Sequence, residues 1–248
     1  MDFHPEKCVA VVTGDFVGFS GLDRTVRSRM PQVIVDAGRS VNKAFGPIVY
    51  GDVDVFRGDG WQALIVEPRS ALRAALFFRA YIIGVTEDRG VDTRIAIGVG
   101  PVDYVPPEKI AAGDGAAYRV SGKLLGKMGS ARAGRIRCAF ADGSETGSAF
   151  VNGLTDGDLI DCVVRLAGAM GDNWRSRRAL AVTGALKGWS HDRIARHWPG
   201  QISRQAVGKH LQKAGWHAIA HALVVFERKM QLWAENDASG TPCPCKRP

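Results

Sequence analysis

The stretch VDVFRGDGWQALIV, residues 53–66, constrains the fold more than any other part of this sequence. Strand-forming residues stand on both sides of Gly58-Asp59-Gly60. An Asp-Gly pair in that setting predicts a β-hairpin, because tight turns between strands need positive φ. We therefore expect an antiparallel strand pair with Asp59 at its turn. Asp59 is either only a turn former or a carboxylate that the turn presents to a ligand.

Strand-like and helix-like segments alternate around this hairpin. The β-branched run at residues 8–15 predicts a buried strand. Residues 22–45 have helical spacing, which Pro31 is expected to divide into two helices. The remaining segments predict a helix, a strand, a helix and a strand at residues 70–84, 93–105, 115–128 and 134–141. This order is typical of the α+β class, with a ferredoxin-like split βαβ sandwich.

The expected topology brings two distant carboxylates together. In a split βαβ arrangement the first two strands run parallel with the third between them. Asp15, at the end of the first strand, and Asp59, at the hairpin turn, then share one sheet edge. Paired carboxylates beside glycines suit Mg or Mn together with a phosphate-bearing ligand. The candidate ligand or metal residues are Asp15, Phe16, Gly18, Arg57, Asp59 and Gly60.

Three motifs resemble the core of the class III nucleotidyl cyclases. They are DFVGFS from Asp15, GDG from Gly58, and RIAIGVGPV from Arg94, within about the first 140 residues. The resemblance implies a cyclase-type sandwich in which Asp15 and Asp59 bind two divalent ions, and these ions activate a ribose hydroxyl and hold a triphosphate. The stretches VVTGDFVG, FRGDGWQALI, RIAIGVG and GDGAAYRVSGKLL, followed by a helix-turn-helix pattern, look like the SatD-like family of bacterial proteins.

Departures from the cyclase pattern predict a catalytically degenerate domain with no catalytic residues. Active cyclases carry an asparagine and an arginine at the third and seventh positions past the aspartate of a Gly-Asp pair. Counted from Asp114, these positions hold Ala117 and Ser121, while Arg119 and Lys123 are each two residues out of register. Loss of a placed arginine costs several kcal/mol of transition-state stabilisation in phosphoryl transfer.

The positive charge of the chain lies in its last third. The formal net charge is +8, and residues 173–248 hold 13 Lys and Arg against 4 Asp and Glu. Such asymmetry predicts a second domain that meets a polyanion, most often nucleic acid. We expect a cyclase-like domain at residues 1–148, a linker helix at 149–172, an all-α helix-turn-helix domain at 173–235 and a disordered tail at 236–248.

A pattern of capped helices in this basic segment indicates the helix-turn-helix. Ser190 is expected to cap a short helix, Pro199 and Gly200 interrupt the chain, and Ser203 is expected to cap the next helix. The outward face of that helix and the flanking arginines predict contacts to base edges and phosphates of duplex DNA. The candidate DNA-binding residues are Arg175, Arg177, Arg178, Arg193, Ser203, Arg204, Gln205, Lys209, Gln212 and Lys213. The alternative is a helical bundle used for dimer packing, with a solvated charged face.

The other potential ligand groups favour no site. His217 and His221 have the i,i+4 spacing of a zinc pair, but a surface or packing role explains them more simply. Five scattered cysteines, two of them Cys243 and Cys245 in a Pro-rich tail, predict no disulfide framework and fit a reducing cytoplasm. No apolar run is long enough to span a membrane, and the first residues do not resemble a signal peptide.

The sequence thus predicts a cytoplasmic, homodimeric transcription regulator that binds double-stranded DNA. Its first domain is expected to sense a nucleotide or cyclic dinucleotide, or to serve as a dimer platform. Two alternatives remain open: an active nucleotidyl cyclase using two divalent metal ions, and a first domain that is purely a structural dimeriser.

Overall fold

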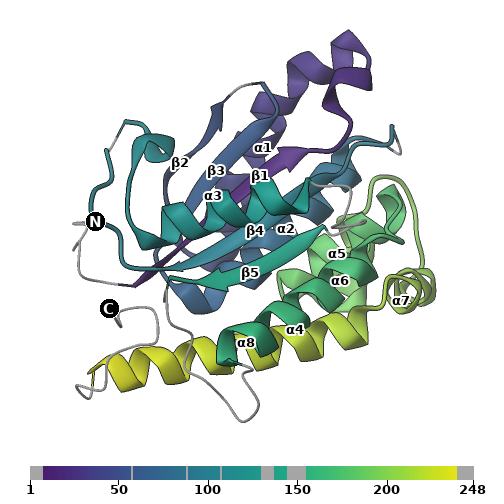
Figure 1. Cartoon of the computed structure of the whole chain (residues 1–248). Coiled ribbons are helices and arrows are strands. Elements are labelled where there is room, and N and C mark those ends of the chain that lie inside the picture. Colours follow the sequence, from purple (N-terminus) through teal and green to yellow (C-terminus); the bar gives the residue numbers. More distant parts are fainter. Residues whose placement is uncertain are drawn as a thin grey trace.

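A five-stranded mixed sheet forms the centre of the molecule (Figure 1). The computed structural model describes residues 8–56, 58–87, 89–106, 108–129, 137–143 and 155–238. In spatial order the strands are β2 (Val49–Phe56), β3 (Gly60–Ile65), β1 (Val9–Phe16), β4 (Thr93–Gly100) and β5 (Cys138–Asp142). β3 is antiparallel to both β1 and β2, so β1 and β2 run parallel with β3 between them. The predicted α+β class and the predicted order of these three strands are confirmed.

The two faces of the sheet bury alternate residues of β1. Ala10 and Val12 pack toward α1 (Arg24–Phe45) and α2 (Ala71–Val85), whereas Val9 and Val11 pack on the other face, with α3 (Ala116–Met128). This alternation follows from the two-residue period of a strand. Short 3-10 turns complete this part of the chain at Phe19–Gly21, Pro68–Ser70 and Ile110–Ala112.

Helix α1 is continuous through Pro31, so the predicted division into two helices is wrong. Met30, Ile34 and Val41 lie on one buried face of α1, on both sides of the proline. Burial of this continuous face stabilises the whole helix by more than the lost backbone hydrogen bond at Pro31 costs. The side chain of Asp23 caps the helix by accepting from the Thr25 amide at 2.7 Å.

Five helices follow the sheet along the chain. They are α4 (Asp156–Gly171), α5 (Ser176–Leu186), α6 (His191–Arg196), α7 (Arg204–Lys213) and α8 (Trp216–Ala238). α4 contacts β5 and α8, while α5 packs against α2 (Figure 1). One buried hydrophobic cluster extends from β1 through α2 to Phe226 and Trp233 of α8. The helices of the basic segment therefore share a core with the sheet.

Two further observations concern cysteines and the membrane. Cys8 is disulfide-bonded, which departs from the fully reduced chain expected from the sequence, whereas Cys138 and Cys162 are free. Among the described helices, none has the length and apolar character needed to cross a bilayer.

Candidate functional site

The structure brings Asp15 and Asp59 to the same end of the sheet. Asp15 stands opposite Gly60 on β3, and the Phe16 amide donates to the Asp59 carbonyl at 3.0 Å. The hairpin turn is thereby fastened to the end of β1. Gly58 has a φ of 83°, the positive value that the hairpin pattern predicts at a tight turn.

The Asp15 carboxylate is occupied by an arginine. Arg94 on the neighbouring strand β4 donates from Nε to Oδ1 at 2.8 Å and from Nη2 to Oδ2 at 2.5 Å. Both side chains are about three-quarters buried, so this bidentate pair is shielded from solvent. The sequence placed Arg94 within a motif but did not assign it to the site. The signal that could have found it is the cross-strand position, since Arg94 pairs directly with Asp15 in the register.

The glycines around the two aspartates serve packing more than ligand access. A side chain at Gly14 would collide with the Trp61 ring, and one at Gly60 would collide with Phe56. Only Gly18, with a φ of 63°, combines a left-handed backbone with open space. The ring of Phe16 is buried in the core, and Arg57 lies outside the described residues. Gly14 and Gly60 are thus required for the packing of these two aromatic rings.

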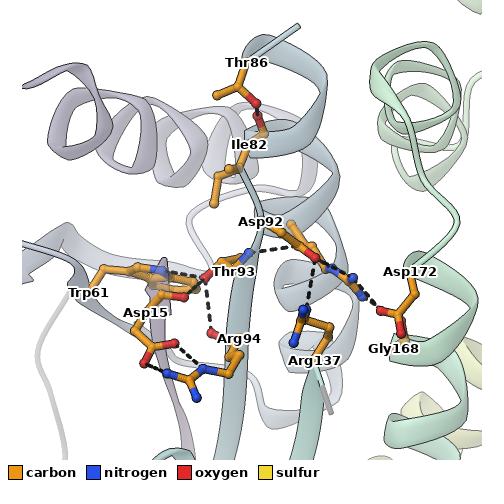
Figure 2. A network of polar contacts seen from close by, with 11 residues as sticks. Asp15, Trp61, Ile82, Thr86, Asp92, Thr93, Arg94, Arg137, Gly168 and Asp172 are labelled. Carbon is orange, nitrogen blue, oxygen red and sulfur yellow. Dashed lines mark hydrogen bonds and ion pairs between the residues drawn. The ribbon is translucent and has the colours of Figure 1, made fainter. Parts of the chain in front are cut away.

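Hydrogen bonds link this site to the start of β4 at Thr93 (Figure 2). The hydroxyl of Thr93 donates to the Asp15 carbonyl at 2.8 Å and accepts from the Trp61 indole nitrogen at 3.1 Å. The Thr93 amide in turn donates to Asp92 Oδ1 at 2.8 Å. The end of β1 is thus held by side chains of β4, and Trp61 of β3 fixes the Thr93 hydroxyl.

A fully buried arginine extends the network to the C-terminal helices. Arg79 on α2 is 0% exposed and donates twice to Asp92, at 2.8 and 2.9 Å. It also donates to Asp172 at 2.7 Å and to the Gly168 carbonyl at 2.6 Å, at the end of α4 (Figure 2). Burial by itself lowers the pKa of Arg79, but its bonds to Asp92 and Asp172 raise it above the ordinary value. The charge is therefore retained in the core.

A divalent ion at this site would share the Asp15 carboxylate with Arg94 or displace it. Magnesium takes one or two carboxylates plus phosphate oxygens, and Asp59 is available for that role. Both oxygens of Asp15, however, already accept from Arg94. Within the described ranges no group of three or more His, Cys, Asp or Glu side chains is placed to hold a metal. A cation with its phosphate ligand would have to compete with the guanidinium.

The two positions where cyclases carry their asparagine and arginine lie in the interior. Ala117 and Ser121 are both 0% exposed. Ser121 shares a hydrogen bond of 2.9 Å with Thr13, to which the Gln62 amide also donates at 2.7 Å. Neither position faces solvent. Arg119 points to the surface instead, where it pairs with Asp114 at 2.9 Å.

Two helices of the basic segment, α6 and α7, begin at serine caps. Ser190 accepts from the Arg193 amide at the start of α6, and Ser203 accepts from the Ala206 amide at the start of α7. Both caps are as predicted. α6 approaches α5 closely because Gly184 leaves room for the Ile194 side chain.

Helix α7 has one buried and one exposed face. Val207 and Leu211 are buried. The residues expected to face outward are all exposed, and they are Ser203, Arg204, Gln205, Lys209, Gln212 and Lys213. Asp192 on α6 lies 3.8 Å from Arg204, but both side chains are exposed, so this contact restrains Arg204 weakly.

Basic side chains of α5 and α7 converge around His210, which sequence reasoning did not assign to the site. The pKa of His210 is lowered by partial burial and then by the charges of Arg177, Arg178 and Lys213. His210 also stacks on Trp198, with 5.6 Å between ring centroids. Arg177 and Arg178 at the start of α5 and Lys213 at the end of α7 therefore place positive charge near His210, on a surface to which both helices contribute.

The two other arginines predicted to contact phosphate are Arg175, at the N-cap of α5, and Arg193, on α6. Arg175 is exposed, and Arg193 lies 4.9 Å from the centroid of Trp189, which holds its side chain. His217 and His221 are exposed on α8.

Comparison with known proteins gives little further information. No protein-family model matches the chain, and no curated protein matches it. A bacterial light-regulated adenylyl cyclase of known structure matches with a TM-score of 0.39 and 19% identity, over 55% of this chain and 44% of that one. The guanylyl cyclase Cya2 matches with a TM-score of 0.37 and 18% identity, over 49% and 70%. This chain spans less than half of that adenylyl cyclase, and likenesses this weak carry no conclusion about activity.

Proposed function

We propose that this chain binds duplex DNA through α5, α6 and α7, with α7 as the helix that enters the major groove. The observation that carries the proposal is the exposed face of α7, with Arg204, Gln205 and Lys209 on its first turns. Arginine and glutamine make bidentate contacts to guanine and adenine edges. A helix anchored by Val207 and Leu211 holds those side chains on a rigid element.

The positive surface around His210 supports the same proposal. Arg177, Arg178 and Lys213 are close enough to lower the pKa of that histidine. Like charges brought together in this way repel one another in the free protein, and a phosphate backbone relieves the repulsion. The sequence resemblance to the SatD-like family, with its helix-turn-helix after a cyclase-like domain, fits a bacterial transcription regulator.

The first domain is proposed to sense a nucleotide or to provide a dimer platform, without turnover. The support is the Arg94 guanidinium on Asp15 and the interior positions of Ala117 and Ser121. The alternative, an active nucleotidyl cyclase, is favoured by the meeting of Asp15 and Asp59 at one sheet end. Incubation with ATP, GTP, CTP or UTP plus manganese, followed by chromatography, is expected to give no cyclic product. A product that disappears in Asp59→Asn would establish the alternative.

The test of DNA binding is selection of duplexes from a random library with the full chain. We expect an enriched motif, and an affinity that falls steeply as salt rises because counterions are released on binding. The matched control is the same selection with a chain in which Arg204 and Gln205 are alanine. Absence of any enriched motif from the native chain, or the same motif from the control, would overturn the assignment of α7.

A further inference from the structure

Helix α4 exposes a line of apolar side chains on its outer side. Leu159, Leu166 and Met170 are exposed large hydrophobic residues, and Cys162 and Ala169 are exposed with them. Positions 159, 162, 166 and 169 alternate steps of three and four residues, so they follow one line along the helix. This is the spacing by which one helix buries a seam against another.

Among the described residues, the packing of α4 leaves Leu159, Cys162, Leu166 and Ala169 exposed, while the partly exposed Met170 also lies beside Gly215, just before α8. Ile160, Val164 and Ala167 on the opposite side are buried, where α4 contacts β5 and α8 (Figure 1). Gly168 lies so close to Cys138 of β5 that a side chain would collide there. The inner face therefore anchors the helix, and the outer apolar residues do not contribute to the core. An extended apolar surface of this kind marks an interaction site.

A groove lies beside the exposed line. Its volume is about 420 Å³, and it is lined by Cys162, Leu166 and Ala169 from the line and by Arg137, Asp161 and Arg165 beside it. The exposed side chains of Leu159 and Leu166 and this groove thus lie on the same face of α4. A two-fold interface needs this combination, because each copy must supply both the knob and the hole.

The charges beside the line also suit a second copy. Arg165 and Asp161 form an ion pair at 2.5 Å on the flank of α4. A two-fold axis near residue 163, close to the middle of the line, places Arg165 beside Asp161 of the partner subunit, and the reverse contact follows by symmetry. The chain as a whole carries a net charge of +8, which repels a second copy over much of its surface. At this patch the opposite charges of Arg165 and Asp161 balance each other.

We propose that the outer face of α4, defined by Leu159, Cys162, Leu166, Ala169 and Met170, joins two copies of this chain into a symmetric dimer with the two α4 helices antiparallel. Each copy inserts its leucines beside the groove of the other. The proposal is independent of DNA binding, since α7 takes no part in the interface. A dimer of this kind would present two copies of α7 to one duplex.

The first experiment measures the mass of the full chain by light scattering at micromolar concentration. We expect a dimer for the native chain and a monomer for Leu166→Glu. The matched control is Val224→Glu on α8, because Leu166 and Val224 are each 61% exposed and Val224 lines a different groove, with Phe45 and Arg73. Val224→Glu is expected to remain dimeric, and circular dichroism checks that both variants fold. A monomeric native chain, or a dimeric Leu166→Glu chain, overturns the proposal.

The second experiment uses Cys162, close to the proposed two-fold axis, as a reporter. The background chain has Cys8, Cys243 and Cys245 replaced by serine, and buried Cys138 stays protonated because burial raises its pKa to about 11. A short bis-maleimide is expected to give a covalent dimer that is lost on Cys162→Ser. Failure to trap a dimer of the background chain, or equal trapping in Cys162→Ser, contradicts the antiparallel α4 pairing.

Discussion

The guanidinium of Arg94 lies against Asp15 at the position where the resemblance to cyclases implies a divalent cation. Its two hydrogen bonds, at 2.8 and 2.5 Å, use both carboxylate oxygens. The positive charge next to Asp15 is therefore supplied by the chain itself. This single contact separates the observed site from the one that the motif implies.

Replacing Arg94 should make the site responsive to metal. We expect manganese to raise the Tm of Arg94→Gln but to leave the native chain almost unchanged, because the freed Asp15 can join Asp59 as a ligand. The gain should disappear in Arg94→Gln/Asp59→Asn. Breaking this pair, whose side chains are about three-quarters buried, should itself cost about 1–3 kcal/mol of unfolding free energy. The control Arg39→Gln, which breaks an exposed pair with Asp52, should cost less than about 1 kcal/mol. An equal Tm shift in the native chain would show that Arg94 does not prevent manganese from binding at Asp15.

Arg79 should be the most sensitive charged residue in the structure. Arg79→Met removes the common partner of Asp92 and Asp172 and should lower the free energy of unfolding by about 3 kcal/mol, measured in urea. Arg119→Met, which breaks only exposed pairs with Asp103 and Asp114, should cost less than about 1 kcal/mol. Similar losses for the two variants would mean that the buried network does not stabilise the junction of α2 with α4.

The lowered pKa of His210 should make stability depend on pH. Between the folded pKa and the ordinary value of 6.5, the unfolded chain binds more protons, so stability is present above that value and is lost as pH falls through the folded pKa. The groups that face His210 are Arg177 and Arg178 on α5 and Lys213 on α7. Urea unfolding at pH 7.5 and 5.5 should show a larger loss for the native chain than for His210→Gln. Equal losses would exclude His210 as the source.

DNA should reverse this effect if the proposed function is right. Phosphates near Arg177 and Arg178 would favour protonated His210, so affinity should rise as pH falls from 7.5 to 5.5, and less so in His210→Gln. Fluorescence anisotropy at constant salt measures the DNA affinity of the native chain and of His210→Gln at each pH. An affinity independent of pH in both chains would place the phosphates elsewhere.

Base and phosphate contacts should separate by their response to salt. Arg204→Ala should cost about 1–3 kcal/mol of binding to an enriched site and reduce discrimination between sequences. Arg177→Ala should weaken binding to all sequences alike and lower the slope of affinity against salt. Isothermal titrations at several salt concentrations distinguish the two. The reverse assignment of effects would show that α5, not α7, contacts the bases.

Local sequence patterns determined much of this fold. The Asp-Gly hairpin, the β-branched first strand and the serine caps of α6 and α7 were predictable, because each depends on residues close together in the chain. The exposed face of α7 was predictable from the helical spacing of its apolar and polar residues. The position of Asp15 next to the hairpin turn followed from topology, since it needed only the order of the strands.

Only the tertiary structure decided what those residues contact. Pro31 did not end α1, because burial of a continuous face outweighs one lost hydrogen bond. Arg94 reached Asp15 through the cross-strand register, and Arg79 joined α2 to the end of α4 across 93 positions of sequence. Ion pairs of this kind depend on three-dimensional distance, which sequence spacing does not encode.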